Sequence, residues 1–301
     1  MSTQYRPEHR LRLWFALLCL SFLACGNELP GTPVDMDGGP PVAGDWNRLI
    51  DVTWTLQPGE EKYICSTRTV TSDVFVSGFR PVPTPFVHHS QLSYDDAQGP
   101  DEAAYPCHGN GDRFYAFATG AGTNEFVFPN AAGIRVRAGQ QLRLTTHLFN
   151  TGDAVQTVTA GVDGFVVAGG TVENEAEMYV TGPVDFTDAP ATLASDCVLD
   201  RDQTLVSILP HMHGRGRHFK AELIAVDGTT TVLFDDAFTF DHQAIVPLLN
   251  VAQAGDKVRT TCTWDTTTGA IKFGSSTNDE MCYSFLTRYP AVGSSDHFCK
   301  H

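Results

Sequence analysis

Short segments that alternate between apolar and polar residues follow one another from residue 47 to the end of the chain. In LRLTTHLF (142–149), leucines fall on one face of a strand and Arg143 and His147 on the other, because successive side chains of a strand point to opposite faces. KAELIAVDGTTTVLF (220–234) predicts a hairpin that turns at Asp227-Gly228. No long window has the period of a helix, so the pattern predicts an all-β fold of antiparallel β-sandwiches.

The stretch FTDAPATL (186–193) predicts a joint within this series of strands. It divides the body into residues 47–187 and 188–301, and each part has about the length of one β-sandwich. No internal repeat relates the two parts. We therefore expect two tandem sandwich domains.

The N-terminus predicts export. Three arginines precede the apolar run LWFALLCLSFLA (13–24), which is too short to span a bilayer but fits the hydrophobic region of a signal peptide. Ala24, Cys25 and Gly26 resemble a bacterial lipobox, although Phe22 stands where the pattern prefers leucine. We expect a signal peptide over 1–24 and a lipid on Cys25, with an ordinary secretory signal as the alternative.

The residues after Cys25, GNELPGTPVDMDGGPPVAGDW (26–46), are rich in glycine and proline. This composition predicts a flexible tether over 25–46 that holds the folded body away from the membrane. The formal net charge of −15 repels nucleic acid and anionic lipid. We expect no nucleic-acid partner and membrane contact only through the lipid, in a bacterial cell envelope at the outer membrane or the periplasmic face.

Six cysteines remain in the predicted body: Cys65, Cys107, Cys197, Cys262, Cys282 and Cys299. In an exported protein they are expected to form three disulfides, although the sequence alone permits about fifteen pairings. Paired cysteines cannot act as thiolate ligands, so any metal site must use other residues.

Two histidines flank a methionine in SILPHMHGRGRH (207–218). On a strand, His211 and His213 share a face, while Met212 points to the opposite face together with Val206 and Ile208. Strand alternation therefore indicates that Met212 packs in the core and that the two histidines could share an ion. Such a pair alone is weak evidence for a metal.

Three further segments carry possible ligands. His88 and His89 are adjacent, so both can bind one ion only at a bulge or a turn. His147 falls on the polar face of its strand, where a lone histidine is usually solvated. Met281, in STNDEMC (276–282), would ordinarily be a core residue, but its thioether is a soft ligand suited to copper(I).

Taken together, these segments resemble the type II copper, ascorbate-dependent monooxygenases, the family of peptidylglycine α-hydroxylating monooxygenase and dopamine β-monooxygenase. The motifs that carry the resemblance follow in family order and span about residues 50–300: PGEEKYICST (58–67), VHH (87–89), LRLTTHLFNTG (142–152), HMHGRGR (211–217) and STNDEMC (276–282). The resemblance implies two jelly-roll-like sandwiches, each with one copper ion facing a cleft between the domains. It implies an all-histidine site at His88, His89 and His147 and a second site at His211, His213 and Met281.

The resemblance also implies a disulfide pattern and an activity. The implied pairs are Cys65–Cys107, Cys197–Cys299 and Cys262–Cys282. A reductant such as ascorbate would reduce both ions, and dioxygen would bind at His211, His213 and Met281. A C–H bond of a small-molecule substrate would then be hydroxylated, with the second electron coming from the all-histidine site.

The substrate cannot be carried over from the peptide-amidating relatives. Their carboxylate-binding arginine lies two residues before the first histidine of H-x-H, where this chain has Leu209. Their helper asparagine and tyrosine correspond to Tyr283 and Phe285. These three residues favour a less polar or aromatic substrate over a glycine-extended peptide.

Two other functions remain open. One is a non-catalytic lipoprotein that binds or sequesters copper in the envelope, and the other is an adhesive sandwich whose histidines are incidental. Possible ligands at both sites favour the enzyme, because storage needs no second site of different softness. The remaining body histidines match no ligand of the family: His108, His218, His242, His297 and His301. We expect His218 to be solvated.

Overall fold

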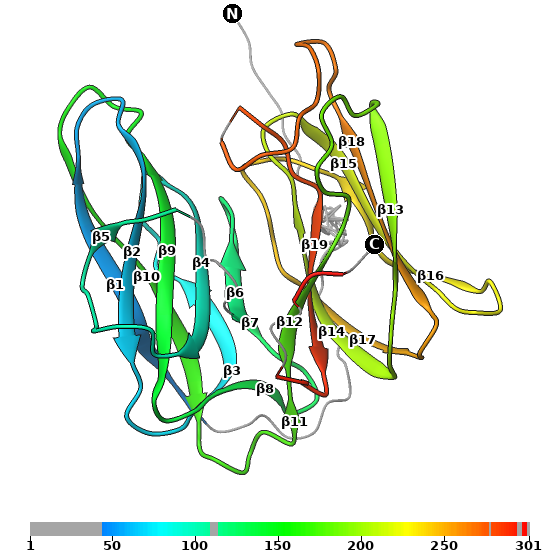
Figure 1. The fold of residues 1–301 in the computed structure, drawn as a ribbon, viewed down its shortest axis with the longest axis horizontal. Coiled ribbons are helices and arrows are strands. Elements are labelled where there is room, and N and C mark those ends of the chain that lie inside the picture. The colour runs from blue at the N-terminus through cyan, green and yellow to red at the C-terminus, as the bar shows by residue number, and fades with distance from the viewer. Residues whose placement is uncertain (1–43, 109–113, 277, 294–296, 300–301) are drawn as a thin grey trace, which may run out of the picture. The chain divides into compact units, whose positions relative to one another are not determined.

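The structure, a computed structural model, describes residues 44–108, 114–276, 278–293 and 297–299. These ranges contain nineteen strands and no helix, so the all-β expectation is confirmed (Figure 1). The described part of the chain accordingly holds no helix long and apolar enough to cross a membrane. The predicted signal peptide, Cys25, most of the tether and His301 lie outside the described residues. The first strand begins at Gly44, so regular structure starts slightly before the predicted end of the tether at residue 46.

The first part of the chain forms two sheets, which pack face to face (Figure 1). One sheet has the order β1-β10-β3-β8-β11, with β7 paired to β3, and consists of β1 (Gly44–Leu56), β10 (Gln156–Val167), β3 (Val74–Pro81), β8 (Ala132–Val136), β11 (Asn174–Glu175) and β7 (Phe126–Val127). The other has the order β5-β2-β9-β4-β6 and consists of β5 (Tyr105–Pro106), β2 (Glu61–Thr69), β9 (Gln140–Phe149), β4 (Val87–Asp96) and β6 (Phe114–Thr119). Apart from the short parallel pair β8–β11, neighbouring strands in these two sheets are antiparallel.

The second part of the chain forms two antiparallel four-stranded sheets. The first has the order β12-β19-β14-β17 and consists of β12 (Glu177–Thr181), β19 (Tyr283–Tyr289), β14 (Gln203–His211) and β17 (Val246–Ala252). The second has the order β13-β18-β15-β16 and consists of β13 (Thr192–Val198), β18 (Lys257–Trp264), β15 (Gly216–Ile224) and β16 (Thr230–Ala237). The hairpin predicted at Asp227-Gly228 is the β15–β16 connection, where Gly228 adopts a φ of 89°.

The predicted joint does not separate the strands cleanly. β12 precedes residue 188 in the chain, yet it pairs with β19 of the second part. A buried ion pair reinforces this pairing, since Arg288 Nη2 lies 2.8 Å from Glu177 Oε1. The division at 187/188 remains a prediction. To group β12 with the sheet in which it pairs, the boundary would have to lie before Glu177.

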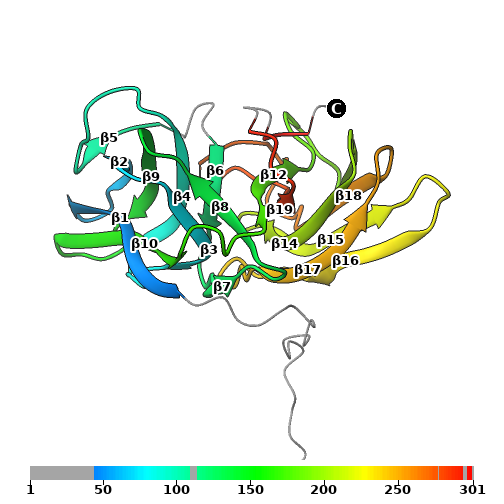
Figure 2. The same cartoon turned by 90° about the horizontal axis from the view of Figure 1, so that it is seen from below.

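The two parts meet along an apolar surface. One buried cluster joins the first two sheets and continues onto Leu209, Tyr283 and Phe285 of the second part. A separate cluster fills the space between the two C-terminal sheets. β6 lies next to β12 where the parts meet (Figure 2). The possible ligands therefore lie on or next to strands that pack at this surface.

Candidate metal centre

A bulge on β4 brings His88 and His89 together. The β4–β9 register shifts between Val87 and His89, so one extra residue stands opposite His147 and Leu148. This is the geometry that two adjacent histidines need in order to face one ion. Nitrogen atoms of His88, His89 and His147 all lie within 4.8 Å of one another, which is close enough to hold a metal ion.

His147 is the best-anchored member of this group. It is 1% exposed on β9, a central and largely buried strand, so it is not solvated as a lone histidine on a polar strand face usually is. Its Nε2 lies 2.8 Å from Glu61 Oε1, and Tyr63 stacks on its ring with 4.2 Å between centroids. Burial raises the pKa of Tyr63 to about 12, so its hydroxyl keeps its proton.

The hydrogen-bond acceptor next to a histidine ring determines which ring nitrogen carries the proton, and the other nitrogen is then free to bind a metal. Because Glu61 accepts the Nε2 proton of His147, the lone pair of His147 lies on Nδ1. That Nδ1 lies 3.0 Å from His88 Nδ1, and the buried Nδ1 of His89 has no hydrogen-bond partner. Burial lowers the pKa of His88 to about 4 and that of His89 well below its usual value. Neutral rings with converging Nδ1 atoms fit a metal ion.

His211 is held by contacts from both parts of the chain. Its Nδ1 lies 2.8 Å from Gln243 Oε1, while Gln243 donates Nε2–H to the carbonyl of Phe240. The turn at 120–123 supports Gln243 through backbone contacts, and Gly120 leaves room for its amide. Burial lowers the pKa of His211 to about 3, so the ring is neutral with its lone pair on Nε2.

His213 follows the end of β14, since the strand ends at His211 and a turn begins after 213. Its Nδ1 lies 3.0 Å from the carbonyl oxygen of Asp279, which leaves the buried Nε2 without a hydrogen-bond partner. Burial lowers the pKa of His213 as well. His211 and His213 thus present Nε2, whereas the first group presents Nδ1.

Met281 lies next to this pair in the folded chain. It follows Glu280, which is 1% exposed and hydrogen-bonded to the backbone N–H of His213. It precedes Cys282, which is bonded to Cys262 of β18. Met281 and His211 line the same cavity of about 230 Å³. Two imidazole nitrogens and a thioether form a donor set that favours copper(I).

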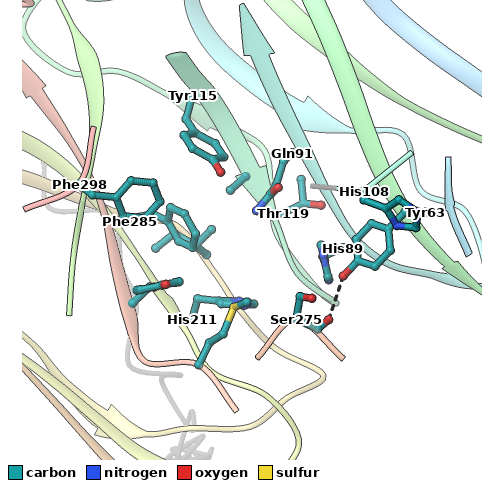
Figure 3. Close-up of a pocket in the computed structure, with 14 residues that line it drawn as sticks. Tyr63, His89, Gln91, His108, Tyr115, Thr119, His211, Ser275, Phe285 and Phe298 are labelled. Carbon is teal, nitrogen blue, oxygen red and sulfur yellow. Dashed lines mark hydrogen bonds between the residues drawn. The ribbon is translucent and has the colours of Figure 1, made fainter. Parts of the chain in front are cut away.

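The two histidine groups lie beside each other. Ring centroids are 6.1 Å apart for His88 and His213 and 6.3 Å apart for His89 and His211. The cavity of about 230 Å³, called the interface cavity below, is lined by residues of both parts, including His89 and His211 (Figure 3). His88 and His213 pack outside its lining, and the expected copper cleft between two domains stays a prediction.

Met212 behaves as strand alternation predicts, but Val206 does not. Met212 is fully buried in the core between the C-terminal sheets, together with Ile208. Val206 is buried in the other core cluster, because the register shifts between Leu205 and Ser207.

Three disulfides join the pairs that the resemblance implies: Cys65–Cys107, Cys197–Cys299 and Cys262–Cys282. The other histidines differ in their surroundings. His218 is partly exposed beside Asp235, and His242 is exposed. His297 is buried against the Phe114 ring, and His108 lines the interface cavity.

Four residues that the sequence did not single out complete the site: Glu61, Tyr63, Gln243 and Glu280. Glu61 and Tyr63 could have been found, since both lie in the EKYICST segment, two residues apart on one strand face. Glu280 directly precedes Met281. The residues around Gln243 in the sequence do not indicate its role, because that role depends on contact with the turn at 120–123, which is distant in the sequence.

Residues 185–301 match the family model "Copper type II ascorbate-dependent monooxygenase, C-terminal domain". The match covers the C-terminal part of the chain, which is less than half of its length. The matched region contains β13 to β19, and with them His211, His213 and Met281. It does not include His88, His89 or His147, and the assignment of both groups as copper sites stays a prediction.

Among solved structures, the chain is similar to "Structure of infectious bursal disease virus Gx strain", at 13% identity and a TM-score of 0.22, covering 87% of this chain and 78% of that one. It is also similar to a Paenibacillus xanthan lyase, at 12% identity and a TM-score of 0.20, covering 88% of this chain and 28% of that one. Neither likeness is strong enough to support an argument about function.

Proposed function

We propose that the chain is a copper-dependent monooxygenase that hydroxylates a C–H bond of a small organic molecule. The reaction consumes the C–H bond, dioxygen, two electrons and two protons, and yields the alcohol and water. An external reductant such as ascorbate supplies the electrons. The family match over residues 185–301 supports this activity.

The observation that carries the proposal is a pair of donor sets that lie beside each other. His88, His89 and His147 offer three neutral imidazole nitrogens. His211 and His213, together with Met281, offer two imidazole nitrogens and a thioether. Two metal sites whose ligands differ in softness are suited to electron transfer between two ions, whereas storage of copper needs no such difference.

The chain's own residues prepare these donors. Glu61, Gln243 and the carbonyl of Asp279 each accept a ring proton, so His147, His211 and His213 present their free nitrogens without reorganising. Copper bound at these residues would supply the redox cycling and the dioxygen chemistry. The interface cavity would position the substrate beside His211 and Met281 and limit access of water to the reacting bond.

We also propose that the protein acts outside the cytoplasm, anchored by a lipid on Cys25. Three disulfides support an oxidising compartment, since such bonds are rare where thiols are kept reduced.

Oxygen uptake by copper-loaded protein with ascorbate and a panel of substrates tests the activity. Met281→Leu keeps the side-chain volume but removes the thioether, and we expect substrate-dependent uptake to fall by about two orders of magnitude. His218→Gln, at a partly exposed histidine that is not among the predicted ligands, is the matched control and should leave uptake unchanged. Tight binding of two copper ions without turnover on the panel would favour the non-catalytic copper-binding lipoprotein.

A further inference from the structure

The interface cavity has one strongly aromatic end. Tyr115 contacts Phe285 and Phe298, with ring centroids 6.4 and 6.1 Å apart. Tyr283 contacts the same two phenylalanines, at 5.8 and 6.1 Å. The four rings therefore form a closed circuit of tilted and edge-on contacts. Such a wall offers both ring edges and ring faces to a flat apolar guest.

This aromatic end adjoins the histidines. The ring of Phe285 lies 5.7 Å from that of His211, in an edge-on arrangement. Figure 3 shows Phe285, Phe298 and Tyr115 on one side of the space and His89 on the other, with His211 between them. A guest ring seated among the aromatic residues would direct its substituent toward His211.

The described residues that line the cavity include no aspartate, glutamate, lysine or arginine. A carboxylate or an ammonium group entering the cavity would lose its hydration without gaining an opposite charge. Ring faces attract cations, but no carboxylate among the described lining residues assists the faces of this wall in holding an ammonium group. The cavity wall does contain uncharged polar groups, on Gln91 and Thr119.

The volume limits the size of the guest. A buried apolar cavity of about 150 Å³ accommodates benzene. At about 230 Å³, the interface cavity has room for one aromatic ring and a short substituent, but not for a peptide of several residues.

We propose that the interface cavity binds an uncharged molecule with a single aromatic ring and a short side chain, and that this is the substrate class of the enzyme. The ring packs against the wall formed by Tyr115, Tyr283, Phe285 and Phe298, and the side chain faces His211 and Met281. The substrate assignment rests on the proposed monooxygenase function, whereas the binding preference does not.

Calorimetric titration of the copper-loaded protein without reductant tests the binding. The ligands form a matched series: 2-phenylethanol, the charged analogues 2-phenylethylamine and phenylacetate, and the saturated analogue 2-cyclohexylethanol. We expect 2-phenylethanol to bind at least about tenfold more tightly than either charged analogue, and more tightly than the saturated ring. Equal or tighter binding of a charged analogue, or no binding of 2-phenylethanol, would overturn the proposal.

Phe298 provides the test within the chain, because it lines the cavity although its side chain is exposed. Phe298→Ala should weaken 2-phenylethanol binding about tenfold, and Phe298→Tyr should restore most of it. Val251→Ala, at an exposed apolar residue of β17, should leave binding unchanged. An unaltered affinity in Phe298→Ala would contradict this placement of the ring.

Oxygen uptake with ascorbate separates the two proposals. If 2-phenylethanol binds as expected but no member of a broad panel is hydroxylated, the monooxygenase function fails and the binding preference stands. If only charged or non-aromatic compounds are hydroxylated, the function stands and the substrate class proposed here is wrong.

Discussion

The carboxylate of Glu280 accepts a hydrogen bond from the backbone N–H of His213, with 3.0 Å between Oε2 and N. The same carboxylate accepts hydrogen bonds from the backbone N–H of Arg215 and from the indole N–H of Trp264. The residue that precedes Met281 thus holds the turn that carries His213. One buried side chain fixes the spacing between two possible ligands that are far apart in sequence.

Glu280→Gln should loosen this connection. The amide replaces one acceptor oxygen by an NH₂ group that would face N–H donors, and leaving a buried donor without an acceptor costs about 1–3 kcal/mol. We expect denaturant unfolding of the copper-free protein to show a loss of that size. A copper titration should show weaker binding at the His211–His213 group. Glu173→Gln, at an exposed carboxylate, is the control, and equal behaviour of the two variants would contradict this role.

The copper-free protein should lose stability as the pH falls below about 6.5. Burial lowers the pKa of His88 to about 4, that of His211 to about 3 and that of His89 well below the usual value. The unfolded chain therefore takes up protons over a range where the folded protein does not. Each such histidine reduces the free energy of unfolding by about 1.4 kcal/mol per pH unit, and its contribution is fully present only above the unfolded pKa.

Urea unfolding at several pH values between 7.5 and 5 would measure this slope. His211→Gln should make the slope shallower, because one buried neutral imidazole is removed. His218→Gln should not, since His218 is partly exposed beside Asp235. A stability independent of pH over this range would show that the buried histidines take up protons in the folded state.

Local rules predicted part of the site because they act over a few residues. Strand alternation separated Met212 from His211, and adjacency required a bulge at His88 and His89, which the structure contains. The register shift beside Ser207 was not visible in the sequence, so Val206 was assigned to the wrong face. Bulges depend on the neighbouring strand, and one residue of slip reverses every side chain beyond it.

Non-local packing determined the rest. The burial of His147 follows from the central place of β9 in its sheet, which the sequence of β9 does not encode. The role of Gln243 depends on the turn at 120–123 in the other part of the chain. The apolar interface through Leu209 and Phe285 likewise joins segments that are distant in sequence. These features required the fold itself.

Gly120 lies in the first part of the chain, and Gly120→Ala should disturb the His211–His213 group in the second part. A Cβ atom at residue 120 would lie 2.5 Å from Gln243 Cδ and 2.6 Å from its Oε1, so the amide would have to move. That oxygen accepts the Nδ1 proton of His211, and we expect copper affinity at this group to fall about tenfold. Copper titration followed by electron paramagnetic resonance would measure the change. Gly99→Ala, where the added Cβ meets nothing within 4 Å, should match the parent protein.

Tyr63 links the first histidine group to the second part of the chain. Its hydroxyl donates a hydrogen bond to the carbonyl of Ser275, at 2.9 Å, while its ring stacks on His147. Tyr63→Phe removes the hydrogen bond and keeps the stacking, at a net cost of about 1 kcal/mol. Amide hydrogen exchange in the segment around Ser275 should then become about fivefold faster, while the spectrum of copper bound at the His88–His89–His147 group stays unchanged.

Two further variants serve as controls. Tyr63→Leu should alter that spectrum as well, since the stacked ring is lost, and Tyr105→Phe on β5 should change neither measurement. Unchanged exchange in Tyr63→Phe would mean that the hydrogen bond does not hold the two parts together.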